Sequence, residues 1–212
     1  MTETKLGQLR AVLPDVSRET FERLLAFESL FTEWNSRINL ASASSVASLW
    51  QRHIVDSAQI GAIAPMSGAW IDAGSGGGFP GIVLAILLNS DGARSHVHLI
   101  ESIGKKAAFL KAALAETGGS GTVHTMRIED ARRLGIRPDF VSARALAPLP
   151  DLLRLTAPWL QSGAKGFFHK GRRRTEEIAA AHGVWRFDLL QHQSRTDTDS
   201  AILEISNVSH RL

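Results

Sequence analysis

The residues best suited to chemistry lie in one short stretch that runs from Trp70 to Gly81. An apolar run ends at Asp72, five glycines follow within positions 74–81, and Pro80 precedes a second apolar run at 82–88. This order is typical of a buried strand, a tight turn and a helix, whose first turn tolerates the missing N–H of proline. Glycines let backbone N–H groups approach a ligand closely, and the helix N-terminus adds further donors. An ordinary strand-to-helix turn needs fewer glycines, so the stretch predicts a site for a nucleotide-like ligand.

The glycine spacing leaves two kinds of ligand open. Gly76, Gly78 and Gly81 fit the G-x-G-x-x-G pattern of dinucleotide sites. Glu101 follows Gly81 by 20 residues, which is also where a dinucleotide site places its acid. Asp72 favours S-adenosylmethionine instead, because a carboxylate before the first glycine suits the cationic amino group of that cofactor, directly or through water. The strand count of the remaining chain also favours a methyltransferase.

The composition is that of an ordinary soluble globular protein of 212 residues. The sequence has no cysteine, which excludes disulfides, a thiolate nucleophile and cysteine-based metal sites, and we expect no bound metal. It also has no apolar run of about 18 residues and no signal-peptide pattern. We therefore expect a cytoplasmic protein that does not enter a membrane.

The positive charge is unevenly spread. The net charge is +3, yet positions 101–174 hold 14 Lys and Arg against 6 Asp and Glu. A field concentrated on one part of a fold favours a polyanionic partner. Any single basic residue is explained better by a solvated helix face, whereas the cluster as a whole favours nucleic acid.

The first part of the chain, residues 1–65, is expected to be an N-terminal helical extension. Ser17 is a candidate helix N-cap, and Phe21, Leu24 and Phe31 then recur at helical spacing. A second helical stretch is expected from about Ser45 to Ile63.

Residues 66–212 are expected to form the main domain. Strands are expected at 69–72, 96–101, 122–127, 140–144 and 165–169, with helices at 80–88, from 102 to a Gly-Gly pair at 118–119, at 149–160 and at 175–182. The runs 184–193 and 201–207 leave no room for a crossover helix and should form an antiparallel hairpin. The predicted fold class is α/β: a seven-stranded, mostly parallel, Rossmann-like sheet of the class I S-adenosylmethionine-dependent methyltransferases. A nicotinamide dehydrogenase would need more chain for its substrate domain.

Ligands of open parallel sheets lie outside the carboxyl ends of the strands, so the residues at those ends are site candidates. Glu101 suits two ribose hydroxyls, and Ile128 and Glu129 are placed to flank an adenine. Arg144 is the candidate catalytic residue, in contact with the carboxylate end of the cofactor or with the target. Its alternative role is a salt bridge with Asp72 or Glu101.

The sequence also restricts the methyl acceptor. Attack on a pyrimidine carbon usually uses a cysteine, which is absent. No Asn-Pro-Pro or Asp-Pro-Pro tetrad follows the fourth strand, as transfer to an exocyclic amine requires. A ring nitrogen with a free lone pair, such as guanine N7, needs no proton removed and only has to be held in line with the sulfonium methyl.

Several motifs together resemble the GidB/RsmG family, the bacterial 16S ribosomal RNA guanine-N7 methyltransferases, over nearly the whole chain. They are Trp34-Asn35…Ile38-Asn39-Leu40, Arg52-His53-Ile54-Val55-Asp56-Ser57, the stretch 72–81, Glu101-Ser102-Ile103-Gly104-Lys105-Lys106, Arg127-Ile128-Glu129-Asp130, Ser142-Ala143-Arg144-Ala145 and Lys170-Gly171. The His-Ile-x-Asp-Ser element is specific, because general methyltransferases lack it. The chain departs from the family at Ala41-Ser42, at His169 and in the unusually basic run Arg172-Arg173-Arg174.

The resemblance implies S-adenosylmethionine as cofactor and a guanine in the decoding-region loop of 16S rRNA, presented within the small ribosomal subunit, as substrate. The expected cofactor site is Asp72, Gly74, Gly76, Gly78, Phe79, Glu101, Ile128, Glu129 and Arg144. The expected RNA-binding residues are Asn39, His53, Asp56, Lys170, Arg172, Arg173 and Arg174. Asn39, His53 and Asp56 also fit satisfied structural groups, and the protein is expected to be a monomer.

Two other functions stay open from the sequence. One is a non-catalytic RNA- or ribosome-binding protein on a methyltransferase fold, and the other is an NAD-dependent oxidoreductase. Titration with S-adenosylmethionine and with NAD distinguishes the oxidoreductase, and methyl transfer to small subunits distinguishes the binding protein.

Overall fold

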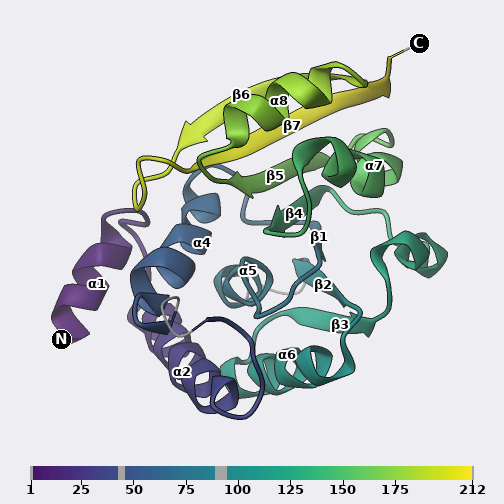
Figure 1. The fold of residues 1–212 in the computed structure, drawn as a ribbon. Helices are drawn as coiled ribbons and strands as arrows, with labels where there is room; N and C mark the ends of the chain where they lie inside the picture. The colour runs from purple at the N-terminus through teal and green to yellow at the C-terminus, as the bar shows by residue number, and fades with distance from the viewer. Residues whose placement is uncertain (1, 43–45, 89–94, 212) are drawn as a thin grey trace.

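The computed structural model describes residues 2–42, 46–88 and 95–211. Within them the chain forms one seven-stranded sheet with helices on both faces (Figure 1). The strands are β1 (Ala69–Ala73), β2 (His96–Glu101), β3 (Gly121–Thr125), β4 (Phe140–Arg144), β5 (Lys165–Lys170), β6 (Trp185–Gln193) and β7 (Ala201–His210). The helices are α1 (Thr2–Arg10), α2 (Arg18–Asn35), α4 (Asp56–Ala58), α5 (Gly81–Leu88), α6 (Gly104–Thr117), α7 (Leu149–Leu160) and α8 (Arg174–His182). None of these helices is long and apolar enough to span a membrane.

The strand order is β3-β2-β1-β4-β5-β7-β6, with β1 to β5 parallel and β7 antiparallel to both β5 and β6. The order reverses between β1 and β4, and at such a switch point the loops after neighbouring strands diverge and leave a crevice. Trp70 pairs with Phe140, and Asp72 pairs with Ser142, across this point. The predicted α/β class, the seven strands and the terminal hairpin are confirmed.

Side chains alternate between the two faces of the sheet, because successive residues of a strand point to opposite sides. Trp70 and Phe167 belong to the apolar core that contains α2, α5 and α6, whereas Ile71 and Phe168 belong to the core under α7 and α8. Helices therefore cover both faces, as a parallel sheet requires (Figure 1).

The N-terminal extension packs directly into the first of these cores. Ser17 caps α2 as predicted, its hydroxyl accepting from the Thr20 N–H at 3.0 Å. Phe27 and Phe31 of α2 are fully buried and pack against Phe109 of α6 at centroid distances of 6.3 Å (stacked) and 5.7 Å (edge to face). The extension thus shares a core with the sheet rather than forming one of its own.

The predicted helical stretch up to residue 63 is helical but is not one regular α-helix, and its predicted start at Ser45 lies outside the described residues. The segment is instead a wide π turn at Trp50–Val55 (η1), one turn of α-helix (α4) and a 3-10 turn at Gln59–Ala62 (η2). Side chains from distant strands bond to its backbone: Arg144 donates to the Arg52 carbonyl at 2.7 Å, and His169 Nε2 bonds to the Asp56 carbonyl at 3.1 Å. These bonds stabilise the irregular backbone, and π turns often mark functional sites.

The third strand ends at Thr125, not at residue 127 as predicted. Arg127 is the N-cap of an unpredicted 3-10 helix, η4 (Ile128–Leu134), which ends at Gly135 in the left-handed region. Ile128 and Ala131 of this helix are buried in the second core. This anchoring fixes the backbone directly after β3.

Candidate active site

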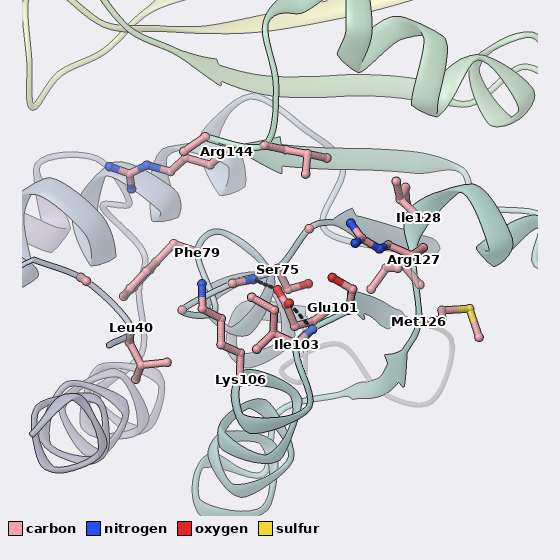
Figure 2. Close-up of a pocket in the computed structure, with 18 of the residues that line it drawn as sticks. Leu40, Ser75, Phe79, Glu101, Ile103, Lys106, Met126, Arg127, Ile128 and Arg144 are labelled. Carbon is pink, nitrogen blue, oxygen red and sulfur yellow. Dashed lines mark hydrogen bonds between the residues drawn. The ribbon is translucent and has the colours of Figure 1, made fainter. Parts of the chain in front are cut away.

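A cavity of about 430 Å³ opens at the carboxyl ends of the parallel strands, beside the switch point (Figure 2). Its walls come from the glycine loop after β1, the end of β2, the loop between β3 and η4, and the end of β4. The lining residues are Phe31, Leu40, Ala41, His53, Gly74–Gly77, Phe79, Ile100–Ile103, Lys106, Met126–Glu129, Arg144–Leu146 and Leu155. The cavity lies where the sequence predicted the ligand site.

Positive φ angles shape the glycine loop. Gly74, Gly76 and Gly78 have φ angles of +68°, +53° and +88°, which side chains other than glycine rarely adopt. A Cβ on Gly74 would lie 2.6 Å from Leu146 Cδ1, whereas a Cβ on Gly76 would meet nothing closer than the Gly74 carbonyl at 3.7 Å. Gly78 is turned away from the cavity, since a Cβ there would lie 2.7 Å from Ile82 Cγ1. Gly74 and Gly76 therefore shape the cavity wall, and Gly78 supports it from behind.

Glu101 holds the glycine loop and lines the cavity at the same time. Its Oε2 accepts from the Gly76 N–H at 2.8 Å and its Oε1 accepts from the Ile103 N–H at 2.7 Å (Figure 2). A carboxylate has about four lone-pair positions, so each oxygen keeps one for a ligand hydroxyl. The geometry is compatible with the predicted ribose contact.

Ile128 and Glu129 lie on the opposite wall, at the start of η4. Ile128 is buried and Glu129 is exposed, and Met126 and Arg127 beside them also line the cavity (Figure 2). No role was predicted for Met126 or Arg127, because the third strand was expected to run on to residue 127. The apolar side chains suit the faces of an adenine ring.

Phe79 closes the other end of the cavity and contacts His53. Their ring centroids lie 5.1 Å apart, and Phe79 also packs against Phe27 and Phe31 at 5.3 and 5.4 Å. Burial, reinforced by the Arg144 charge, lowers the pKa of His53 to about 4, so its ring is neutral at pH 7. His53 is thus part of the cavity wall.

Asp72, which was predicted to help hold the cofactor's amino group directly or through water, does not line the cavity. It is 1 % exposed and lies under the glycine loop, where its Oδ1 accepts from Ser142 Oγ at 2.7 Å and its Oδ2 lies against Gly81 of α5. Burial raises the pKa of Asp72 to about 6, against the opposing effect of its hydrogen bonds. Its place on the helix-facing side of β1, shared with Trp70, decides this orientation.

Arg144 is held by a different acid from the two that the sequence suggested. Its Nη1 lies 3.4 Å from Asp56 Oδ2, and its Nη2 donates to the Arg52 carbonyl at 2.7 Å. The guanidinium points away from Glu101, past Phe79 (Figure 2). Arg144 thus joins the end of β4 to the N-terminal extension.

Asp56 is the centre of a buried polar network. Its Oδ1 accepts from Gln59 Nε2 at 2.9 Å, from Ser194 Oγ at 3.0 Å and from Thr196 Oγ1 at 2.8 Å. Its Oδ2 faces Arg144 and, at 3.8 Å, His169 Nε2, whose pKa burial lowers. With 6 % of its surface exposed, Asp56 is buried and holds the side chains around it in place.

This network borders a second cavity of about 500 Å³, at the ends of β4 and β5. The two cavities share Arg144, Ala145 and Leu146. The remaining lining residues are Asp56, Ala147, Pro148, His169–Gly171, Glu177, Ser194, Ser200 and Ala201. Arg144 therefore stands at the boundary between them.

Lys170 is arranged differently from the predicted phosphate contact. Its Nζ is buried and donates to the Ala147 carbonyl at 2.6 Å and to Glu177 Oε2 at 2.8 Å. Glu177 in turn accepts from the Leu149 N–H at the start of α7, at 2.9 Å. Lys170 thus holds the ends of β5, α7 and α8 together.

The arginine run after β5 is exposed but paired. Arg172 donates to Asp199 Oδ2 at 2.8 Å, Arg173 to Glu176 Oε2 at 3.3 Å and Arg174 to the Asp199 carbonyl at 2.6 Å. Asp199 lies in the β6–β7 loop, which the sequence could not place beside this run. Exposed pairs are weak, so phosphate can still compete for Arg172 and Arg173.

Asn39 is exposed and lies outside both lining sets. The turn that carries Leu40 and Ala41 to the cavity wall is organised by Asn35 instead, whose Oδ1 accepts from both of their N–H groups at 2.9 Å. An asparagine at a helix end is a sequence signal for such a turn.

The cavity fits S-adenosylmethionine. Its glycine loop has no space for a Cβ at Gly74, Glu101 offers a carboxylate with free lone pairs, and Ile128 forms an apolar wall. When bound, this cofactor supplies an electrophilic methyl group on its sulfonium.

The model of the family GidB, described as rRNA small subunit methyltransferase G, matches residues 20–204. The chain belongs to the GidB family. Among relatives named "Ribosomal RNA small subunit methyltransferase G", that of Chelativorans sp. is 47 % identical over 98 % of this chain and 99 % of the relative. That of Bartonella bacilliformis is 48 % identical over 98 % and 96 %. This GidB protein is therefore an S-adenosylmethionine-dependent methyltransferase, as predicted.

Solved structures show the same fold at low sequence identity. M. jannaschii TYW2, crystallised with AdoMet, aligns with a TM-score of 0.52 and 13 % identity over 76 % of each chain. The M. jannaschii fibrillarin pre-rRNA processing protein aligns with a TM-score of 0.51 and 12 % identity over 68 % of each chain. The GidB chain thus has the Rossmann-like methyltransferase fold.

Proposed function

We propose that this protein transfers the methyl group of S-adenosylmethionine to N7 of a guanine in 16S rRNA, with the small ribosomal subunit as its substrate. The observation that carries the proposal is the state of the acids in the second cavity. Asp56 accepts from three side-chain donors and faces Arg144, and Glu177 accepts from Lys170 and the Leu149 N–H. Neither is free to act as a base, and N7 needs none.

The proposed reaction depends on position. A guanine that enters the second cavity beside Arg144 brings its ring nitrogen towards the cofactor cavity, and orientation of this kind contributes much of an enzyme's rate enhancement. The product carries a positive charge on the ring. Asp56 offsets the Arg144 charge, and His53 is neutral at pH 7, so the wall does not oppose that charge.

The site residues are proposed accordingly. Gly74, Gly76, Phe79, Glu101, Ile128 and Glu129 hold the cofactor, Arg144 contacts the target, and Asp56 positions Arg144. The extension 1–65 and the domain 66–212 are proposed to act as one unit, since Phe31 and Leu40 of the extension line the cofactor cavity. We further propose that the protein is a monomer in the cytoplasm. Light scattering of the purified protein measures its mass in solution and so tests whether it is a monomer.

The deciding experiment is transfer of tritiated methyl from S-adenosylmethionine to purified small subunits, followed by mapping of the modified base. We expect one labelled guanine in 16S rRNA and weaker labelling of the naked RNA. Subunits already methylated at that guanine are the control and should accept no label. Binding of S-adenosylmethionine without transfer to any subunit preparation would favour the non-catalytic alternative. Preferential binding of NAD would favour an oxidoreductase.

A further inference from the structure

Lys106 is a basic side chain in the wall of the cofactor cavity. It lies in the first turn of α6 and is half-buried, and its ammonium points towards the space between Phe79 and Ser75 (Figure 2). Within residues 2–42, 46–88 and 95–211, no ion pair joins it to a carboxylate. A cation aimed into a concave site without a counter-charge is suited to an anionic group of the ligand.

The lining residues lie in a definite order along the cavity. Met126 and Ile128 lie at one end, Glu101 in the middle, and Lys106 and Phe79 towards the other end (Figure 2). With the adenine against Ile128 and the ribose on Glu101, the amino-acid end of S-adenosylmethionine extends towards Lys106. That end carries the only carboxylate of the cofactor.

The two other cations of the cavity are less suited to this carboxylate. Arg127 lies beside Ile128, at the adenine end (Figure 2). Arg144 is held by Asp56 and by the Arg52 carbonyl, and its guanidinium points out past Phe79. Lys106 is the remaining basic side chain in the lining set.

We propose that Lys106 forms an ion pair with the α-carboxylate of S-adenosylmethionine, and that it selects for cofactors that carry this carboxylate. The proposal rests on the cofactor assignment above and replaces the predicted contact of Arg144 with the carboxylate end. The sulfonium and the α-amino group are both cationic, so Lys106 favours the cofactor only through its carboxylate. Without that group, the Lys106 charge opposes binding.

The test is calorimetric titration of the full-length protein with three probes. S-adenosylmethionine and S-adenosylhomocysteine both carry the carboxylate, and decarboxylated S-adenosylmethionine lacks only that group. We expect Lys106→Gln to weaken binding of the first two by about tenfold, the effect of losing a charge-assisted bond. Decarboxylated S-adenosylmethionine should bind the variant as tightly as the parent, or more tightly.

Lys105→Gln is the matched control, because Lys105 is the preceding residue of the same helical turn, is exposed and is not in the lining set. It should leave all three affinities within twofold of the parent, and Lys106→Arg should restore most of the lost affinity. An equal loss for all three probes, or no loss for any, would overturn the Lys106 assignment. Failure of the parent to bind S-adenosylmethionine would instead overturn the cofactor assignment.

Discussion

The two cavities at the carboxyl edge of the sheet are built in different ways. The cofactor cavity consists mainly of short contiguous stretches, 74–77, 100–103 and 126–129, whose backbone shapes the space. The second cavity depends on side chains from distant parts of the chain: Arg144 reaches the Arg52 carbonyl across 92 residues, and Ser194 reaches Asp56 across 138. The first cavity therefore depends on the absence of side chains at the glycine positions of its loop, and the second cavity depends on ion pairs and hydrogen bonds between side chains.

The largest effect on cofactor affinity should come from a side chain that fills the space beside the glycine-loop backbone of the first cavity. We expect Gly74→Leu to reduce binding of S-adenosylmethionine by more than about a hundredfold, because the position has a φ of +68° and its Cβ would collide with Leu146. Calorimetric titration measures the loss.

Gly135→Leu is the control for Gly74→Leu. Gly135 has a nearly equal φ of +65°, but a Cβ there meets nothing within 4 Å. It should cost stability through backbone strain while leaving cofactor affinity within about threefold. Equal loss of affinity in both variants would contradict the assignment of the glycine loop to the cofactor site.

The second cavity should be disrupted by removal of the Asp56 carboxylate. Asp56→Ala removes the acceptor of three side-chain donors and leaves the buried Nη1 of the half-buried Arg144 without its acid. We expect the free energy of unfolding to fall by about 3–5 kcal/mol, the usual cost of breaking a buried ion pair. Denaturant titration measures it, and cofactor affinity of the folded variant should stay within about threefold.

Asp151→Ala is the exposed counterpart of Asp56→Ala. Its pair with Arg154 spans 3.7 Å at the surface, so its removal should cost less than about 1 kcal/mol. Similar costs for the two substitutions, or loss of cofactor affinity in Asp56→Ala, would contradict the separation of the two cavities.

The acid beneath the first cavity, Asp72, should make stability depend on pH, because in the part of the chain that the structure describes no ion pair holds it as Arg144 holds Asp56. Its pKa rises from 3.8 to about 6 on folding, so the folded protein binds the proton more tightly than the unfolded chain. Its stabilising contribution is complete below about pH 4 and is lost as the pH rises through 6, an effect of about 3 kcal/mol. Asp72→Asn does not titrate, so its stability relative to the parent should increase by that amount between pH 4 and pH 7.5. Parallel stability curves for the two proteins would show that Asp72 does not titrate in this range.

The smallest effect is expected at the paired arginines beside the second cavity. Each phosphate contact contributes roughly 0.7–0.9 to the slope of log affinity against log salt. Because Arg172 and Arg173 already pair with Asp199 and Glu176, changing Arg172, Arg173 and Arg174 to Ala should flatten the slope for small subunits by about one contact, not three. Asp199→Asn removes the acid that pairs with Arg172 and should make the slope of log affinity against log salt steeper. Identical slopes in all three proteins would show that the run does not contact RNA.

The sequence by itself determined the α/β fold, the order of its elements and the cofactor cavity. Alternating apolar runs specify parallel strands, and the residues from Gly74 to Phe79, with Glu101 and Ile128, lie at or shortly after the ends of strands that meet at one edge of the sheet. Periodicity and turn chemistry act locally, so they can be read along the chain. The same rules could not detect η4, because a 3-10 helix has no strong sequence period.

Only the tertiary structure decided what the polar side chains contact. Asp72 faces α5, and Lys170 is buried against Glu177. Arg144, whose alternative role was a salt bridge with Asp72 or Glu101, pairs with Asp56 instead. Lys106, one of two adjacent lysines in the sequence, is the one that enters the cavity. Partners such as Ser194 and Asp56, which are 138 residues apart, meet only when the extension and the hairpin pack against the sheet. No local pattern encodes such pairings, because the free energy of a charge depends on the neighbours that folding brings to it.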